Sequence, residues 1–306
     1  MINLIYATGE SESRRLPVEE GESRPEDLPC GSKHHRPPLL ASLALYAGII
    51  TALILMTPAL QRYPVSTSIL ISEWMFIMIP CLIFLRALHV RPKSDLRITG
   101  ISIGTAIGAA LVSISGILLT GELVAIQNEI VPIPPEYLEM MRELFTLPGD
   151  VHWTYSAFVF GISPAICEEL LFRGILLQGA LGKVSPSWAV LITGLLFGLF
   201  HLDPYRFVGT TVLGFIMAYV ALRASSLLAS MVYHAANNLM ILLAMNAAPL
   251  KEVPWLMEEA HVPFALLLLS GVVFIGGLVF IRTNPKGVER PLVLSDPGKN
   301  FSDDEP

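Results

Sequence analysis

Two adjacent glutamates and an arginine interrupt a stretch that is otherwise apolar enough to cross a bilayer, AICEELLFR over residues 165–173. A charged side chain in the middle of a spanning helix costs about 2.5–3.5 kcal/mol on insertion scales, so each needs a partner or a task. Glu169 and Arg173 are four residues apart, which predicts a structural ion pair on one helix face. Glu168 points about 100° away from Glu169 and has no partner in its own helix. We therefore interpret Glu168 as the carboxylate that does chemistry.

Three further polar side chains lie in the apolar stretches that follow this motif: His201, His234 and Asn238. A single histidine in an apolar helix is ordinarily a residue that hydrogen-bonds to a neighbouring helix. Together with an unpaired glutamate, these residue types can activate a water molecule and stabilise an oxyanion. Asn237, three residues after His234, fits the same geometry as Asn238. The pattern predicts hydrolytic chemistry and leaves the choice of asparagine open.

The elements that must position these residues are membrane-spanning helices. The chain has 306 residues, of which 53% are hydrophobic and 15% charged, and its mean hydropathy of +0.60 excludes a soluble protein of this length. A spanning helix needs about 20 apolar residues. The predicted fold is all-α, a polytopic transmembrane helical bundle with about eight spans, at 37–61, 66–85, 98–121, 153–181, 186–201, 207–222, 227–248 and 262–281.

The polar parts of the chain define its organisation. Residues 1–38 predict a disordered polar tail, 39–282 the transmembrane domain and 283–306 a polar C-terminal tail. Most of the 20 Lys and Arg fall on one set of connections if both termini are cytoplasmic, as expected for an integral protein of a bacterial or archaeal plasma membrane. Within the acidic loop 122–150, the apolar residues of EYLEMMRELF recur at helical spacing and predict a helix on the membrane surface.

Three motifs resemble those of a known family. EELLFR (Glu168–Arg173) resembles EExxxR, Phe197–His201 resembles FxxxH, and His234–Asn238 resembles HxxxN. These are motifs of the CPBP family of intramembrane glutamic endopeptidases, which includes the CAAX prenyl proteases, the bacteriocin-processing proteins and the Abi group. The motifs occur in the order of the family, and the resemblance covers about residues 150–245, the predicted catalytic core.

The resemblance implies a role for each polar residue. Glu168 is expected to activate the attacking water, and His201 to hold or deprotonate it. His234 and Asn238 are expected to face the developing oxyanion. The implied partners are the lipid bilayer and a membrane-associated polypeptide, either lipidated or carrying a leader. Nothing in the sequence predicts a nucleic-acid partner, and the oligomeric state stays open.

Zinc is the one cofactor that these residues suggest. Glu168, His201 and His234 are a carboxylate and two histidines, a ligand set that zinc accepts with an open position for water. The chain lacks HExxH, which would place two histidines on one helix face beside a base. We therefore favour a metal-independent mechanism with glutamate and water, and keep zinc as the alternative.

Other functions fit part of the pattern. Ser163 in GISP resembles a serine nucleophile of a rhomboid-like protease, but Pro164 follows it directly and the histidines are better used with Glu168. Cys167 lies in an apolar helix, which favours an inert thiol. A transporter with a polar relay would distribute its polar groups over more spans. A catalytically idle membrane scaffold would not need the complete set of four polar residues.

Overall fold

The computed structural model describes residues 36–146, 152–247 and 261–283, and these residues form helices without a single strand. The predicted all-α fold is therefore confirmed. The two predicted tails lie almost entirely outside the described residues, as does the acidic segment 248–260.

The helices follow the predicted spans in order. They are α1 (Leu39–Leu60), α2 (Val65–Ile71), η2 (Ser72–Met78), α3 (Ile79–Ala87), α4 (Pro92–Asp95), α5 (Ile103–Ile130), α6 (Pro135–Phe145), α7 (Trp153–Ser156), η3 (Ala157–Ile162), α8 (Ser163–Glu169), η4 (Leu170–Leu176), α9 (Leu177–Leu181), α10 (Pro186–Phe200), α11 (Phe207–Ala224), α12 (Leu227–Asn246) and α15 (Phe264–Thr283). The η segments are π-helical, a conformation found frequently at functional sites. They lie inside two continuous helices, 65–87 and 153–181.

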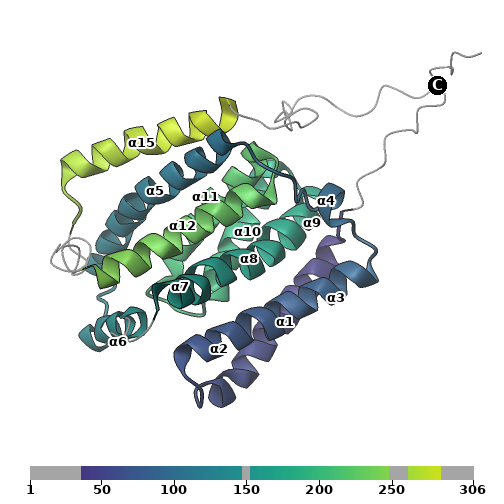
Figure 1. The fold of residues 1–306 in the computed structure, drawn as a ribbon, viewed down its shortest axis with the longest axis horizontal. Helices are drawn as coiled ribbons and strands as arrows, with labels where there is room; N and C mark the ends of the chain where they lie inside the picture. The colour runs from purple at the N-terminus through teal and green to yellow at the C-terminus, as the bar shows by residue number, and fades with distance from the viewer. Residues whose placement is uncertain (1–35, 147–151, 248–260, 284–306) are drawn as a thin grey trace, which may run out of the picture. The chain divides into compact units, whose positions relative to one another are not determined.

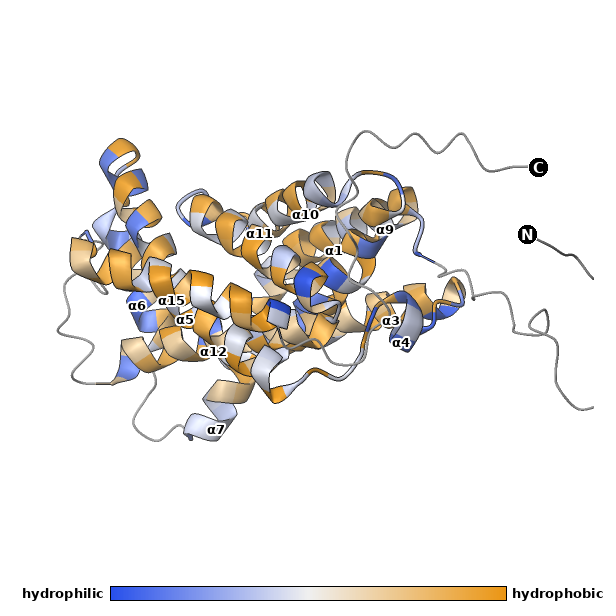
Figure 2. Cartoon of the chain, turned by 90° about the horizontal axis from the view of Figure 1, so that it is seen from above, coloured by the Kyte–Doolittle hydropathy of each residue, from blue (hydrophilic) through white to orange (hydrophobic). Residues whose placement is uncertain are grey.

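Six of the described helices are long and apolar enough to cross a membrane: Leu39–Leu60, Val65–Ala87, Ile103–Ile130, Phe207–Ala224, Leu227–Asn246 and Phe264–Thr283. Most of the ribbon of the long helices has the colour of hydrophobic residues in Figure 2, and Phe264 and Val272 on α15 are 74% and 69% exposed. These features show an integral, multi-pass membrane protein. The two other predicted spans are helical as well, but 153–181 carries the charged motif and α10 has 15 residues. The count of eight spans remains a prediction.

The charged motif lies on the central helix of the described bundle. Figure 1 shows α15 beside α5, followed by α12, by α8 and α10, and then by α1 with α2 and α3. Every residue from Leu170 to Leu176 is buried, and Arg173 and Phe172 are among the largest fully buried side chains. Because protein surrounds this helix, its charged groups meet other side chains instead of lipid.

One predicted boundary differs from the structure. Helix α5 begins at Ile103, where the Ser102 hydroxyl accepts a hydrogen bond from the Thr105 backbone N–H at 2.9 Å. It continues to Ile130, so that Glu122 and Glu129 lie on the helix and not in a loop. The apolar pattern ends earlier than the helix because backbone hydrogen bonds continue where side chains turn polar. Both glutamates contact His261 at 2.9 Å, which supports the extension.

Candidate active site

The charged residues of the motif helix divide between two environments. Arg173 Nη1 lies 2.7 Å from Glu169 Oε1, and both side chains are completely buried. The other end of the guanidinium donates to the backbone oxygen of Gly214 on α11, at 3.0 Å. Glu168 lies on a different face and lines a cavity. This arrangement follows from helical spacing, because residues four apart share a face and adjacent residues do not.

His234 lies between the two glutamates. Its Nδ1 is 3.1 Å from Glu169 Oε1, and its Nε2 is 3.8 Å from Glu168 Oε2. A carboxylate only accepts hydrogen bonds, so Nδ1 carries a proton and Nε2 is directed toward Glu168 and the cavity. Glu169 therefore orients the imidazole as well as contacting Arg173, a second contact that helical spacing within one segment did not predict.

His201 caps the C-terminal end of α10 and lines the same cavity. Its Nδ1 lies 2.9 Å from the backbone oxygen of Phe197. Since that oxygen accepts, Nδ1 is protonated, and Nε2 of the neutral ring keeps a lone pair that can accept a proton from water. The Phe197 ring packs against the rings of both histidines, with centroids at 5.1 Å from His201 and 5.8 Å from His234.

Glycines on α10 and α11 let these two helices pack closely, and this packing places His201 at the site. A methyl group at Gly198 would lie 1.9 Å from Thr211 Oγ1, and one at Gly194 would lie 2.0 Å from the Phe215 ring. The two glycines are four residues apart, the small-residue spacing that lets membrane helices approach closely. The close approach also places the backbone oxygen of Gly214 within hydrogen-bond distance of the Arg173 guanidinium. The segment GLLFG, residues 194–198, is the signal in the sequence that could have predicted this close approach.

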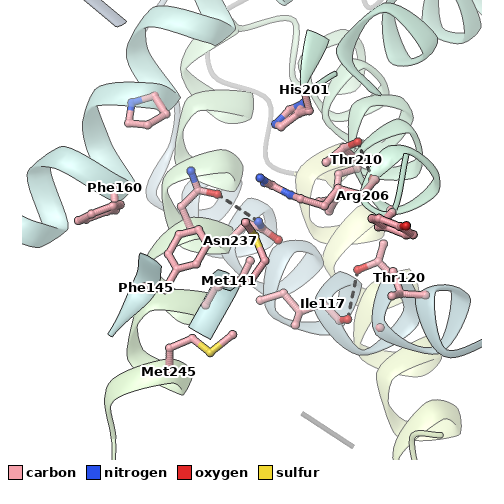
Figure 3. Close-up of a pocket in the computed structure, with 18 of the residues that line it drawn as sticks. Ile117, Thr120, Met141, Phe145, Phe160, His201, Arg206, Thr210, Asn237 and Met245 are labelled. Carbon is pink, nitrogen blue, oxygen red and sulfur yellow. Dashed lines mark hydrogen bonds between the residues drawn. The ribbon is translucent and has the colours of Figure 1, made fainter. Parts of the chain in front are cut away.

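The two asparagines of α12 also line the cavity and are hydrogen-bonded to each other. Asn237 Nδ2 donates to Asn238 Oδ1 at 3.3 Å. Because the Asn238 oxygen accepts this bond, its amide N–H groups are left to donate elsewhere. Asn237 Oδ1 is buried and makes no hydrogen bond within the described residues. Figure 3 shows Asn237 among the side chains that line the cavity, which include Arg206 and His201.

One cavity of about 510 Å³ collects all four predicted catalytic residues: Glu168, His201, His234 and Asn238. Most of the remaining wall is apolar and comes from α5, α6, α11 and α12. Helix α6, predicted as a membrane-surface helix, turns Tyr137, Met141 and Phe145 toward this cavity (Figure 3 labels Met141 and Phe145), while its glutamates are exposed. Its apolar face thus meets protein in the described structure.

Three charged residues that line the cavity were not among the predicted site residues: Glu73, Arg206 and, on α6, Arg142. Glu73 on η2 is 6% exposed and lines the cavity. A lone acid in a spanning helix is a signal of function in itself, so this residue was detectable. Arg206, which precedes α11, points into the cavity in Figure 3, and it forms no ion pair with any residue that the structure describes. Its charge acts on Glu168 and His201 and favours an anion in the cavity.

The side chains of Ser163 and Cys167 do not act as nucleophiles in this arrangement. Ser163 is completely buried, and its hydroxyl accepts a hydrogen bond from the indole of Trp74 at 2.9 Å. Cys167 is completely buried as well. Neither residue lines the cavity. The rhomboid-like alternative thus has no accessible serine at this position.

A zinc ion does not fit the donor geometry. No group of three or more His, Cys, Asp or Glu side chains among the described residues converges as metal ligands would. We therefore derive no step through a metal.

Comparison with known proteins identifies one segment. Residues 150–240 match the family model of type II CAAX prenyl endopeptidases, Rce1-like. The match contains all three motifs and every predicted catalytic residue. No curated protein and no solved structure matches this chain.

Proposed function

We propose that this protein hydrolyses a peptide bond of a membrane-associated polypeptide within the bilayer, because residues 150–240 match the Rce1-like family model of type II CAAX prenyl endopeptidases. One observation carries the proposal: Glu168, His201, His234 and Asn238 line a single cavity. Side chains from α8, α10 and α12 meet there, although 70 residues separate the first from the last. A protein with a purely structural role would not need these polar groups around an open space.

In the proposed reaction, Glu168 is the general base. Its carboxylate takes a proton from a water molecule, whose oxygen forms a bond with the carbonyl carbon of the substrate. The resulting tetrahedral intermediate loses its amine when the C–N bond breaks, and Glu168 returns the proton to the nitrogen. His201 Nε2, with a free lone pair directed by the Nδ1 contact to Phe197, holds the water for attack.

Asn238 and His234 stabilise the charge that develops on the carbonyl oxygen. The Asn237 amide donates a hydrogen bond to the side-chain oxygen of Asn238. The Asn238 amide N–H groups are therefore the part of that side chain that can donate into the cavity. His234 donates from Nδ1 to Glu169, so its Nε2 has a fixed position beside Glu168, and Nε2 donates to the oxygen in the imidazolium form, in which both ring nitrogens carry a proton. Donors that are oriented before the reaction need no reorganisation during it, and one such donor is typically worth about 2.7–4 kcal/mol of barrier.

The walls of the cavity support an apolar, membrane-associated substrate. Residues such as Ile117, Leu213, Met217 and Phe160 form much of the lining, and the volume of about 510 Å³ accommodates several apolar side chains or part of a lipid chain. Such a site suits C-terminal processing of a lipidated polypeptide, and removal of a leader from a small secreted peptide is the alternative substrate class.

The experiment compares two kinds of cell, one with the wild-type protein and one with the Glu168→Gln variant at equal expression. We expect a small set of membrane proteins to show new terminal peptides with the wild type only. The purified wild type in phosphatidylcholine vesicles should also cleave a prenylated peptide that ends in a CAAX sequence. Identical terminal peptides in both cells would leave a transporter or an idle scaffold as the function.

A further inference from the structure

The sequence before the matched segment contributes one acidic residue to the lining of the cavity, Glu73. It lies in η2, in a helix whose other charged residue, Arg86, is near the C-terminal end. Its side chain is almost completely buried, and its Oε2 makes no hydrogen bond within the described residues. An unsatisfied buried polar atom costs about 1–3 kcal/mol, so its position needs an explanation.

The position of Glu73 relative to the motif helix is well determined by its neighbour. The Trp74 indole N–H donates to Ser163 Oγ at 2.9 Å and thereby ties η2 to α8. Both Glu73 and Glu168 line the cavity, and their carboxyl groups are close enough to interact electrostatically and to share a hydrogen bond. The carboxylate that the sequence analysis placed alone in its helix thus faces a second carboxyl group from another helix.

Two carboxyl groups in contact, in a site largely shielded from water, do not both carry a negative charge, and they hold one proton between them. Glu168 has one negative neighbour, Glu169, and this is opposed by the positive Arg173 and Arg206 and by the contact with His234. The groups that act on Glu73 are Glu168 and the Cys167 thiol, and neither is a cation. Charge is therefore better accommodated on Glu168, and the proton belongs on Glu73. A protonated carboxyl group is a hydrogen-bond donor.

We propose that Glu73 is a positioning residue of the active site: its protonated carboxyl group donates a hydrogen bond to Glu168 and holds that base in the orientation needed to activate water. The inference rests on the proposed function, since it gives Glu73 a role only if Glu168 is the base. It extends the catalytic machinery to a helix outside residues 150–240, the matched segment.

The test uses the full-length protein in phosphatidylcholine vesicles with the prenylated CAAX peptide as substrate. Glu73→Leu removes the donor, and we expect kcat to fall by about 10–100-fold, as for other groups that orient a reactive side chain, with little change in KM. Leucine inserts into a bilayer far more readily than a charged residue, so poor insertion would not account for the loss. Glu73→Gln keeps an N–H donor and should retain most of the activity.

Met75→Leu is the matched control, because Met75 lies two residues away on the same helix and is 55% exposed. It should leave kcat and thermal stability unchanged. Glu168→Gln is the second control, and it separates the two hypotheses. If Glu168→Gln abolishes turnover while Glu73→Leu keeps wild-type kcat, the role of Glu73 is wrong and the proposed function stands.

Three other outcomes would also overturn the role of Glu73. If Glu73→Gln is as inactive as Glu73→Leu, a hydrogen-bond donor does not suffice. If Glu73→Leu lowers the melting temperature and the active fraction together, with unchanged kcat per active molecule, Glu73 is structural. If wild-type turnover is absent, or persists fully in Glu168→Gln, the proposed function fails and the role of Glu73 fails with it.

Discussion

Two clusters in this protein have the same composition, one histidine between two glutamates: the central cluster of His234, Glu168 and Glu169, and the edge cluster of His261, Glu122 and Glu129. In the central cluster the side chains are between 0% and 10% exposed, whereas in the edge cluster they are 20–66% exposed. The contacts are of similar length: Nδ1 lies 3.1 Å from a glutamate oxygen in the first and 2.9 Å in the second. Burial is therefore the main difference between them.

This difference decides what each cluster can do. At the edge, water and ions screen the charges, so the pairs contribute little to stability and mainly connect the start of α15 to α5. In the centre, each charge must be balanced by a neighbour, and Arg173 and His234 supply that balance for Glu169. Glu168 retains an unsatisfied buried oxygen, and this is the feature expected of a group that acts on a substrate.

The most severe way to test the comparison is to neutralise the cavity-facing carboxylate. We expect Glu168→Gln to lower kcat by about 10²–10⁴-fold, because a general base is lost. The melting temperature should change little, since glutamine has the same shape. Activity assays and thermal unfolding of both proteins in one detergent check this. Glu129→Gln at the edge is the matched control and should leave turnover unchanged; wild-type turnover of Glu168→Gln contradicts the role of base.

Removal of the central cation should affect stability instead. Arg173→Met leaves Glu169 buried without its main partner, and we expect a loss of about 3–5 kcal/mol in the free energy of unfolding. Denaturant or thermal unfolding measures it. Arg223→Met is the control, because Arg223 is only partly buried and packs on the Tyr219 ring at 5.7 Å. Equal losses in the two variants would mean that burial does not distinguish these cations.

The oxyanion partner can be identified with two single variants. Asn238→Ala should raise the barrier by about 2.7–4 kcal/mol, which corresponds to a 10²–10³-fold loss in kcat, because a donor to the oxyanion is removed. Asn237→Ala should cost less, since that side chain only orients its neighbour. Steady-state kinetics of both variants at matched folded fraction make the comparison. A larger loss for Asn237→Ala would reverse the assignment.

The edge cluster should give a small, pH-dependent effect. The hydrogen bonds that His261 donates to Glu129 and Glu122 raise its pKa. A group whose folded pKa is raised contributes stability that is complete below its unfolded pKa, about 6.5, and that disappears as the pH rises through the folded value. The wild type should therefore melt slightly above His261→Ala in acid and equally in alkali. A difference in melting temperature between the two proteins that grows with pH would contradict this prediction. High salt should reduce the difference seen in acid.

Chelation should have the smallest effect of all. The described donors do not converge as a metal site, so we expect dialysis against a chelator to leave kcat unchanged. The activity before dialysis, after dialysis and after addition of zinc gives the answer. Loss of activity that zinc restores would mean that the central cluster rearranges around a metal.

Much of the helical structure of this protein, and the set of polar residues at its site, can be predicted from local patterns in the sequence. Hydropathy and length predicted the helices, since the bilayer requires long apolar segments whose backbone bonds are internal. Helical spacing separated Glu168 from Glu169 and paired the latter with Arg173. The three motifs pointed to one site, and the structure brings their four polar residues to one cavity, although their catalytic roles remain predictions.

Only the tertiary structure decided which helix faces meet. Glu73 and Glu168 are 95 residues apart, and no local pattern places their carboxyl groups together. The contact of Glu169 with His234, the entry of Arg206 into the cavity and the turning of α6 toward it depend in the same way on packing between distant segments. The geometry of a helix determines how residues are spaced on its faces. Which neighbouring helix packs on each face depends on the fit of the whole helices, as on α10, where Gly194 and Gly198 let α11 pack closely.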